Sequence, residues 1–422
     1  MLKNGWKMLR EDMRKNPRII RHTMALFAAQ IAVILTGFLI KGIQTRALGP
    51  ETYGLYAFFG TVTGILAIVF RFGHYNSIKV LLAENKDPEK EKQFFGLGLL
   101  TAIAIGFLYA LAIFLLSFLI DYRFGPEYGR IFRLFAAFTI VYPMQFMISD
   151  LSVGSNRIYP SALMEVGSKL LYLIPLYILF SRSSLDLYQV IFLNLITGLL
   201  AVIAVFIWLR PSFRHLDRLY AILKQKNKEY GWHFYLGIVS NQTTYRLDEV
   251  FIATLINTTQ LGFYSLAGVI CSPMVMLSRA FSQAMFKRFA HSPRIPAKLF
   301  IYNTLWLLFS IAVVYLLAGP VVRFLFGEAF APVADYAFWL SFAYFFQGAY
   351  QPFTFLSAKS QGKELRNVAF AEAAVNVLGN LILIWFYGIY GVIAASILAR
   401  FVQFSGLFYY YRKYLRTHLK QG

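Results

Sequence analysis

Residues 94–120 read FFGLGLLTAIAIGFLYALAIFLLSFLI, a stretch without a single charged side chain. A helix of that length rises roughly 40 Å at about 1.5 Å per residue, which exceeds the roughly 30 Å hydrocarbon core of a bilayer. Apolar residues would occupy every face of this helix, so its surroundings must be lipid or other apolar helices. The stretch therefore predicts a transmembrane helix.

Similar apolar runs recur along the whole chain, and the clearest of them are residues 25–40, 190–209 and 299–317. Counting such runs predicts about twelve transmembrane helices. They are expected near residues 23–42, 53–73, 94–120, 130–150, 160–180, 188–209, 232–256, 262–286, 298–318, 335–356, 367–387 and 391–411. The predicted fold class is an all-α membrane protein.

The composition agrees with this class and explains the high net charge. The chain is 58% hydrophobic and 14% charged, and it carries 41 Lys and Arg against 20 Asp and Glu, a net charge of +21. A basic surplus of this size often indicates nucleic-acid binding. Here about 29 of the basic residues fall on the side of the N-terminus and only about six on the other side. The positive-inside rule then predicts that both termini face the cytoplasm, and no nucleic-acid partner is needed.

The spans divide the chain into five predicted regions. These are a cytoplasmic amphipathic N-terminal segment at 1–22, a six-helix bundle at 23–209, a basic cytoplasmic linker at 210–231, a second six-helix bundle at 232–411 and a cytoplasmic tail at 412–422. The first segment mixes apolar and basic residues, which suits a helix lying on an anionic leaflet. A simple topogenic tail is an equally good interpretation.

The two bundles resemble each other at a shift of 208 positions. The sequence GLYA at 54–57 corresponds to GFYS at 262–265, and Arg71 corresponds to Arg279. Further matches in the same register indicate a duplication. A shift by six spans preserves orientation, so we expect parallel repeats around a central cavity that holds the substrate.

Ionised side chains inside the spans are the candidate functional residues, because each costs at least about 2.5 kcal/mol at the bilayer centre unless it faces a cavity or a partner. Arginine presents a permanent, bidentate charge that suits a phosphate-bearing headgroup. The predicted headgroup-binding residues are Arg71, Arg246, Arg279, Lys169, Arg400 and Arg46. The alternative for Arg71 and Arg279 is that both extend to the cytoplasmic interface.

Carboxylates at similar depth are candidates for binding a coupling ion, either H⁺ or Na⁺. They are Asp248, Glu165 and Glu372. Glu249 follows Arg246 at i+3 and is expected to pair with it, whereas Asp248 lies on another face. With Asn241, Thr243 and Thr244 these residues make span seven polar, which favours a cavity-lining helix over a structural ion pair. Glu165 and Lys169 are at i and i+4 and could neutralise each other.

Several segments resemble the bacterial polysaccharide flippases of the Wzx type, in the multidrug/oligosaccharidyl-lipid/polysaccharide exporter superfamily. These are RALGPETYGLY at 46–56, Arg246-x-Asp248 followed by LGFYSLA at 261–267, and Asn376-x3-Asn380-LIL leading to YGIYG at 387–391.

The resemblance implies two six-helix bundles around a cationic cavity in the bacterial inner membrane. It also implies movement of an undecaprenyl-diphosphate-linked oligosaccharide to the periplasmic leaflet, driven by the membrane potential or an ion gradient. By position, Arg71, Arg246, Asp248 and Arg279 would line the cavity. The implied partners are the lipid-linked oligosaccharide, membrane lipids, and a polysaccharide polymerase and chain-length proteins of the same pathway.

Two other classes stay open. A cation-coupled multidrug exporter of the same superfamily should have mainly acidic residues in its cavity, and a membrane enzyme of the glycan pathway should carry a large external catalytic loop. The sequence has no G-x4-G-K-[ST] loop, no H-E-x-x-H and no paired C-x-x-C. We therefore expect no enzyme activity, no cofactor and no metal site.

Overall fold

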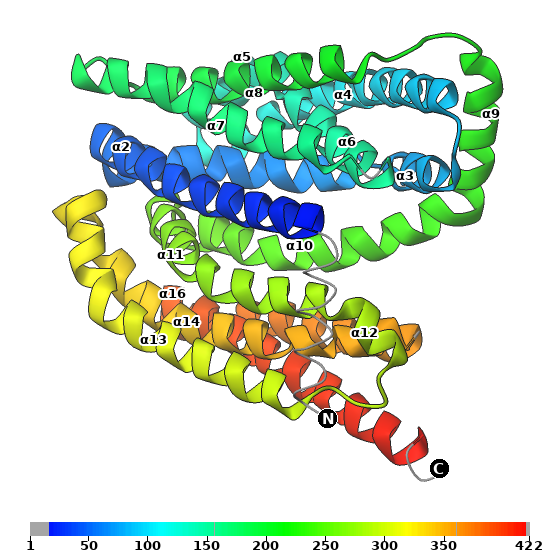
Figure 1. The fold of residues 1–422 in the computed structure, drawn as a ribbon. Coiled ribbons are helices and arrows are strands. Elements are labelled where there is room, and N and C mark those ends of the chain that lie inside the picture. The colour runs from blue at the N-terminus through cyan, green and yellow to red at the C-terminus, as the bar shows by residue number, and fades with distance from the viewer. Residues whose placement is uncertain (1–16, 156, 360, 419–422) are drawn as a thin grey trace. The chain divides into compact units, whose positions relative to one another are not determined.

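The computed structural model describes residues 17–155, 157–359 and 361–418 (Figure 1). Within these ranges, the side chains of residues 17–31, 158, 233, 237, 238, 240–245, 284, 287, 290 and 418 lie outside the description. Most of the predicted N-terminal amphipathic segment, residues 1–16, also lies outside it. The described ranges form helices and turns and contain no strand, which confirms the predicted all-α class.

The helices follow one another through short connections. In chain order they are α2 (Pro17–Val69), α3 (His74–Glu84), α4 (Pro88–Phe124), α5 (Pro126–Phe135), η1 (Ala136–Ile140), α6 (Val141–Gly154), α7 (Ile158–Ser181), α8 (Leu187–Leu209), α9 (Leu216–Lys226), η2 (Asn227–Gly231), α10 (Trp232–Leu255), α11 (Thr258–Ala284), α12 (Phe286–His291), α13 (Ala297–Leu325), η3 (Glu328–Phe330), α14 (Pro332–Ala349), η4 (Gln351–Phe353), α15 (Thr354–Ala358) and α16 (Gly362–His418).

In the described ranges, nine helices are long and apolar enough to cross a membrane. Two of them are broken internally, α2 at Gly49 (φ 70°, ψ 174°) and α16 at Gly388 (φ 53°, ψ −127°). Both breaks fall between predicted spans, and both use a positive φ that glycine adopts without strain. Each of these helices therefore holds two of the predicted spans. The span predicted at 232–256 corresponds to α10, and the chain is a multi-pass membrane protein.

The contacts group the described residues into two compact units. Unit 1 holds the residues up to 47 and 70–235, and unit 2 holds 48–69 and the residues from 236 onward. The second half of α2 therefore groups with the C-terminal helices, whereas the sequence places it in the N-terminal bundle. The predicted cavity between the two bundles stays a prediction.

Unit 1 is built around α4, which packs against α5, α6 and η1, while α7 packs against α8 and α3 against α6. In unit 2, α14 is central and contacts α11, α13 and α16. Large apolar side chains on the outward faces of α4 and α13 are exposed, for example Phe107 at 67% and Leu316 at 65%. Exposure of this extent suits a lipid-facing surface.

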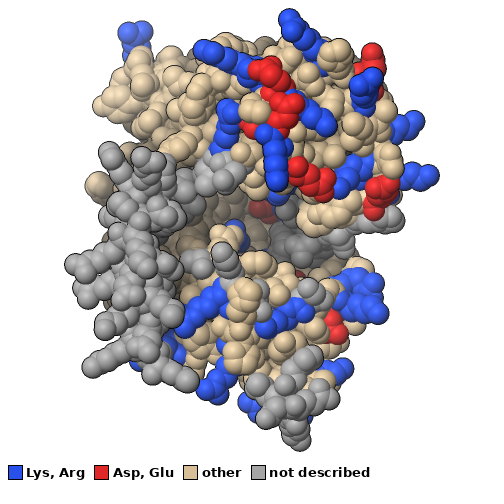
Figure 2. Space-filling view, turned by 45° about the vertical axis from the view of Figure 1, so that its right-hand side comes forward, with Lys and Arg blue, Asp and Glu red and all other residues tan. Residues whose placement is uncertain are grey.

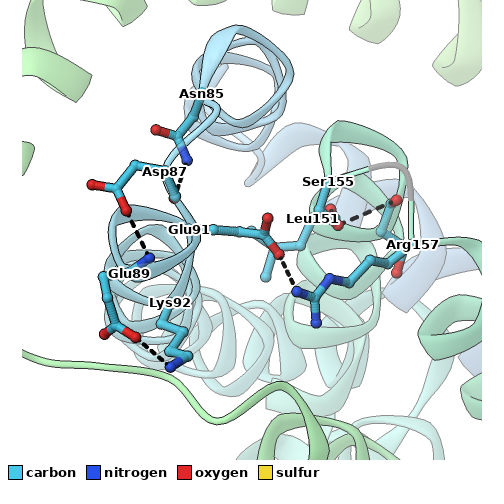
Figure 3. A network of polar contacts seen from close by, with 9 residues as sticks. Asn85, Asp87, Glu89, Glu91, Lys92, Leu151, Ser155 and Arg157 are labelled. Atoms are coloured by element: carbon cyan, nitrogen blue, oxygen red, sulfur yellow. Dashed lines mark hydrogen bonds and ion pairs between the residues drawn. The ribbon is translucent and has the colours of Figure 1, made fainter.

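Charged side chains gather at one end of unit 1. Figure 2, which turns the side holding α3 and α9 forward, shows Lys, Arg, Asp and Glu crowded on the visible face. Figure 3 shows part of this end, where the Asp87 carboxylate accepts from the Glu89 backbone N–H and so caps α4. The Arg157 guanidinium lies 2.8 Å from Glu91 and ties the start of α7 to the start of α4.

The duplicated GLYA and GFYS motifs meet in unit 2. An ideal Cβ built on Gly54 would lie 2.3 Å from the carbonyl oxygen of Thr258, and one on Gly262 would lie 3.1 Å from the Gly54 Cα. The second half of α2 and the start of α11 therefore cross with their backbones in contact. Only glycine permits this approach. We call this contact the glycine crossing.

Candidate functional site

Asp248 on α10 is buried among neutral hydrogen-bond donors in unit 2. Its Oδ2 accepts from Tyr264 OH at 3.1 Å and from Ser396 Oγ at 2.7 Å, and its Oδ1 accepts from Asn380 Nδ2 at 2.8 Å. No Lys, Arg or His in the described ranges lies within ion-pair distance of it. A carboxylate buried in this way is stabilised by dipoles alone, so a cation or a proton would add favourable charge compensation.

The sequence of α16 explains how two of these groups, Asn380 and Ser396, reach Asp248. Before the break, Glu372, Asn376 and Asn380 recur at a spacing of four and form one buried polar stripe. After the break, Ser396 and Arg400 repeat that spacing. Arg400 Nη1 lies 2.9 Å from Glu372 Oε1, although a straight helix would separate the two residues by roughly 42 Å. Gly388 therefore folds α16 back on itself and brings both stripes to one site.

A pocket of about 310 Å³ opens beside this cluster, between α10, α11, α14 and α16. Its charged lining residues are Asp248, Glu249 and Arg400, and Tyr344 and Gln347 add polar groups. The volume is at the lower end of the range for small-ligand sites. It suits a hydrated ion or a single phosphate group, and it is too small for an oligosaccharide.

One oxygen acceptor near Asp248 has no donor of its own. The buried Asn380 Oδ1 has no hydrogen-bond partner among the described residues. Carboxylate, amide and hydroxyl oxygens are the ligands that hard cations prefer. No group of three or more His, Cys, Asp or Glu side chains suited to a metal ion occurs in the described part of the chain. The arrangement therefore fits H⁺ or an alkali cation better than a transition metal.

Arg246 lies two residues before Asp248 on α10 and points to a different face of that helix. Its Nη1 is 3.9 Å from Glu249 Oε2, which confirms the predicted i, i+3 pair. Glu249 also accepts from Thr61 Oγ1 at 2.7 Å, and the Arg246 guanidinium lies over Gly64, where an ideal Cβ would be 2.6 Å from Nη1. The Arg246 side chain stays 41% exposed. The neighbouring predicted polar side chains, Asn241, Thr243 and Thr244, lie outside the described ones.

Arg71 occupies a different setting from the one that the sequence suggests. It lies in the turn between α2 and α3, and its Nη2 is 2.6 Å from Asp150 Oδ2 on α6, with both side chains 9% exposed. Its guanidinium also lies 4.8 Å from the centre of the Phe146 ring, and Lys79 approaches Asp150 from outside at 3.5 Å. Arg71 thus has a structural partner within unit 1, and its role in headgroup binding stays a prediction.

His74 lies three residues after Arg71, at the start of α3 and outside the predicted spans. Burial lowers the pKa of His74 below its usual value, and a backbone hydrogen bond at Phe72 opposes part of that shift. The neutral imidazole is therefore the form that the fold favours.

The remaining predicted residues are not brought into one site within a unit. Lys169 on α7 is partly buried in unit 1, and its Nζ lies 3.4 Å from the Val33 carbonyl oxygen. Glu165 is exposed and makes no ion pair with Lys169 in the described structure. Arg46 and Arg279 are exposed and belong to different units.

The sequence predicted Asp248, Glu372 and Arg400, but it missed Tyr264, Asn376, Asn380 and Ser396 as members of the same cluster. The signal that could have found the asparagines is their spacing of four within an apolar span, in register with Glu372.

Comparisons with known proteins identify the family and the fold of this chain. The profile of the family described as polysaccharide biosynthesis protein matches residues 19–291. No curated protein matches the chain.

Three solved structures share the fold. The lipid II flippase MurJ in an inward closed conformation superposes with a TM-score of 0.69 at 14% identity, covering 91% of this chain and 87% of that one. An inward-facing multidrug resistance MATE family transporter of the MOP superfamily gives 0.67 at 14% identity, covering 92% and 96%. A MOP superfamily transporter from Pyrococcus furiosus, described as having a binding pocket of reverse polarity, gives 0.54 at 13% identity, covering 92% and 96%.

At these identities the structures establish the fold alone, which is that of the MOP superfamily transporters. The profile match covers more than half of the sequence, so it establishes the family. This chain belongs to the polysaccharide biosynthesis protein family.

Proposed function

We propose that this protein is a flippase that moves an undecaprenyl-diphosphate-linked oligosaccharide from the cytoplasmic to the periplasmic leaflet of the bacterial inner membrane, by alternating access. The observation that carries the proposal is the family match over residues 19–291 on a fold that a lipid II flippase shares. The distribution of basic residues supports a topology with both termini in the cytoplasm. A polysaccharide polymerase and chain-length proteins would act on the product.

The electrostatics of such a cargo favour outward movement. A prenyl diphosphate carries about two negative charges, so crossing a cytoplasm-negative potential of roughly 100 mV is favourable by about 4.6 kcal/mol. Basic side chains within the spans lower the barrier, because the headgroup exchanges its water for their hydrogen-bond donors. This proposal requires no enzymatic step.

We also propose that Asp248 binds the coupling ion, either H⁺ or Na⁺. The support is its burial, the absence of a cationic partner among the described residues, and the buried Asn380 Oδ1, which has no hydrogen-bond partner among them. Ser396, Asn380 and Tyr264 come from two helices, so an ion here would stabilise one arrangement of α10, α11 and α16 over others. Coupling then follows from the different ion affinities of the transport states.

The second candidate function is a cation-coupled multidrug exporter. The observation that favours it is the pocket beside Asp248, whose lining holds two carboxylates and one arginine. Organic cations would bind there by charge, whereas a diphosphate would be repelled unless it contacts Arg400 or basic residues elsewhere.

Purified protein in liposomes distinguishes the two functions. A fluorescent undecaprenyl-diphosphate oligosaccharide is placed in the membrane, and its transfer is followed by access to a membrane-impermeant modifying reagent while a potassium diffusion potential is imposed. We expect protein-dependent transfer that accelerates when the starting side is negative. Transport of ethidium without transfer of the lipid would instead establish the exporter, and transfer of neither would overturn both functions.

A further inference from the structure

The segment between α8 and α10 is strongly basic and lies across one end of unit 1. Residues 210–231 hold six Lys and Arg against two Asp and Glu. Within this segment α9 packs against α3 and α4, and Figure 1 shows it running across the direction of α4 and α8. Because α4 and α8 are long and apolar enough to span the membrane, a helix that crosses their ends lies along the membrane surface.

Polar contacts hold α9 in place at both of its ends. Before the helix, the Ser212 backbone N–H donates to the Lys92 carbonyl oxygen at 2.8 Å. At its last residue, Lys226 Nζ lies 2.8 Å from Glu84 Oε1 at the end of α3. All four residues belong to unit 1. The unit therefore presents the outward face of α9 in one orientation.

The two faces of α9 differ in polarity. Leu219 and Leu223, one helical turn apart, are buried on the inner face. Lys224 and Lys228 are exposed, and neither makes an ion pair with another residue in the described part of the chain. Lys226, between them, is held in its ion pair with α3. The outward face therefore carries two positive charges that the described residues do not compensate.

A groove of about 600 Å³ opens beside these two lysines. Most of its lining residues recur every three or four positions and so share one side of the chain; they are Ala221, Lys224, Gln225, Asn227, Lys228 and Trp232. Trp232, which is 44% exposed, supplies an apolar wall. Tryptophan is enriched where the hydrocarbon of a bilayer meets its headgroups. The groove thus combines an apolar surface with positive charge at the level expected for lipid headgroups.

We propose that this groove binds one anionic phospholipid, with Lys224 and Lys228 on its phosphate and Trp232 against the first carbons of its acyl chains. Lysine ammonium groups donate to phosphate oxygens while their alkyl stems lie along apolar surface. Two uncompensated positive charges favour a headgroup of net negative charge over a zwitterionic one. This lipid is a resident partner and not the cargo, so the inference does not depend on the proposed function.

The test is a lipid titration of the purified full chain in detergent, followed by native mass spectrometry. The lipids are phosphatidylglycerol, zwitterionic phosphatidylcholine and geranylgeranyl diphosphate. The variants are K224Q/K228Q, the charge-preserving K224R/K228R, and W232A, which removes the apolar wall and keeps every charge. The matched control is K86Q/K90Q, because Lys86 and Lys90 are also exposed, also four residues apart and near the start of α4, but do not line the groove.

We expect the wild type to bind phosphatidylglycerol more tightly than phosphatidylcholine, and K224Q/K228Q to bind phosphatidylglycerol about tenfold more weakly. K224R/K228R should retain most of the affinity, because arginine also donates to phosphate. W232A should weaken the binding of phosphatidylglycerol as well, and K86Q/K90Q should match the wild type.

Unchanged affinity for phosphatidylglycerol in K224Q/K228Q overturns the site. If that double variant does not fold, unchanged affinity in both K224Q and K228Q overturns it equally. An equal loss in K86Q/K90Q would show diffuse surface charge in place of a groove, and equal wild-type affinities for the two phospholipids would remove the charge selection. A loss confined to geranylgeranyl diphosphate would assign the groove to the cargo and overturn the resident lipid.

Discussion

Replacing Asp150 by asparagine should destabilise unit 1 strongly, because it removes the negative partner of a buried arginine. Arg71 Nη2 and Asp150 Oδ2 are 2.6 Å apart, and each side chain is only 9% exposed. Loss of one member of a buried pair leaves an uncompensated charge and costs about 3–5 kcal/mol. Lys79 would reinforce the effect, since it also loses its contact with Asp150 and adds like charge at the rim.

The free energy of unfolding can be measured by reversible denaturant titration in mixed micelles, following tryptophan fluorescence. Glu328→Gln is the matched control, because it breaks the exposed Arg323–Glu328 pair, whose side chains are 66% and 75% exposed. Such surface pairs contribute about 0–1 kcal/mol. The double variant Arg71→Met with Asp150→Leu should recover most of the loss, since apolar replacement of a buried pair is close to neutral.

A loss below about 1 kcal/mol in D150N, similar to the loss in E328Q, would contradict this reasoning. It would mean that water reaches Arg71 and that its guanidinium is available to a ligand. Flipping assays on Arg71 variants therefore need this stability measurement beside them.

Three further predictions follow from the site and the fold. Asp248→Asn should abolish the dependence of lipid transfer on the coupling ion and slow the initial rate of transfer at least tenfold. The rate is measured in liposomes with and without Na⁺ and pH gradients. An unchanged ion dependence would remove Asp248 from the coupling site. Gly54→Ala should destabilise the protein by about 1–3 kcal/mol through overpacking against Thr258. Gly60→Ala on the same helix should not destabilise it, because nothing lies within 4 Å of the new Cβ. Equal melting temperatures of the two variants would argue against the glycine crossing. The pKa of His74 is lowered in the folded state, so just below the usual histidine pKa of about 6.5 the unfolded chain binds more protons than the folded chain. The stability contributed by this group is therefore present above that pH and is lost as the pH falls through the folded-state pKa. A His74→Gln variant should lose less stability than the wild type between about pH 7 and 5, and identical pH profiles would refute the assignment.

The sequence was a good guide to the helices and a poor guide to their partners. Apolar runs marked the spans, and the breaks at Gly49 and Gly388 fall between spans that the sequence had separated. The i, i+3 pair of Arg246 and Glu249 was predictable because both residues lie on one helix. These features depend on neighbours in the chain.

Contacts between distant helices could not be derived in this way. Asp150 is 79 residues from Arg71, and Ser396 is 148 residues from Asp248. Which face of each helix meets which other helix is decided by packing across a whole unit, and periodicity along one span does not contain that information. The sequence therefore identified charged residues inside the membrane, but it could not distinguish Arg71, which is paired, from Lys169, which makes no ion pair within 4 Å among the described residues.

The glycine crossing also bears on how the second half of α2 can move against α11. Where two helices pack through interdigitated side chains, a change in the angle between the helices requires those side chains to change rotamer. This requirement resists rotation of one helix against the other. At Gly54 and Gly262 one backbone contacts the other directly, so we expect the angle between the two helices to change there more readily than at a contact built from side chains. Because GLYA at 54–57 corresponds to GFYS at 262–265 in the predicted duplication, the glycine that permits this contact occurs at the same place on each helix.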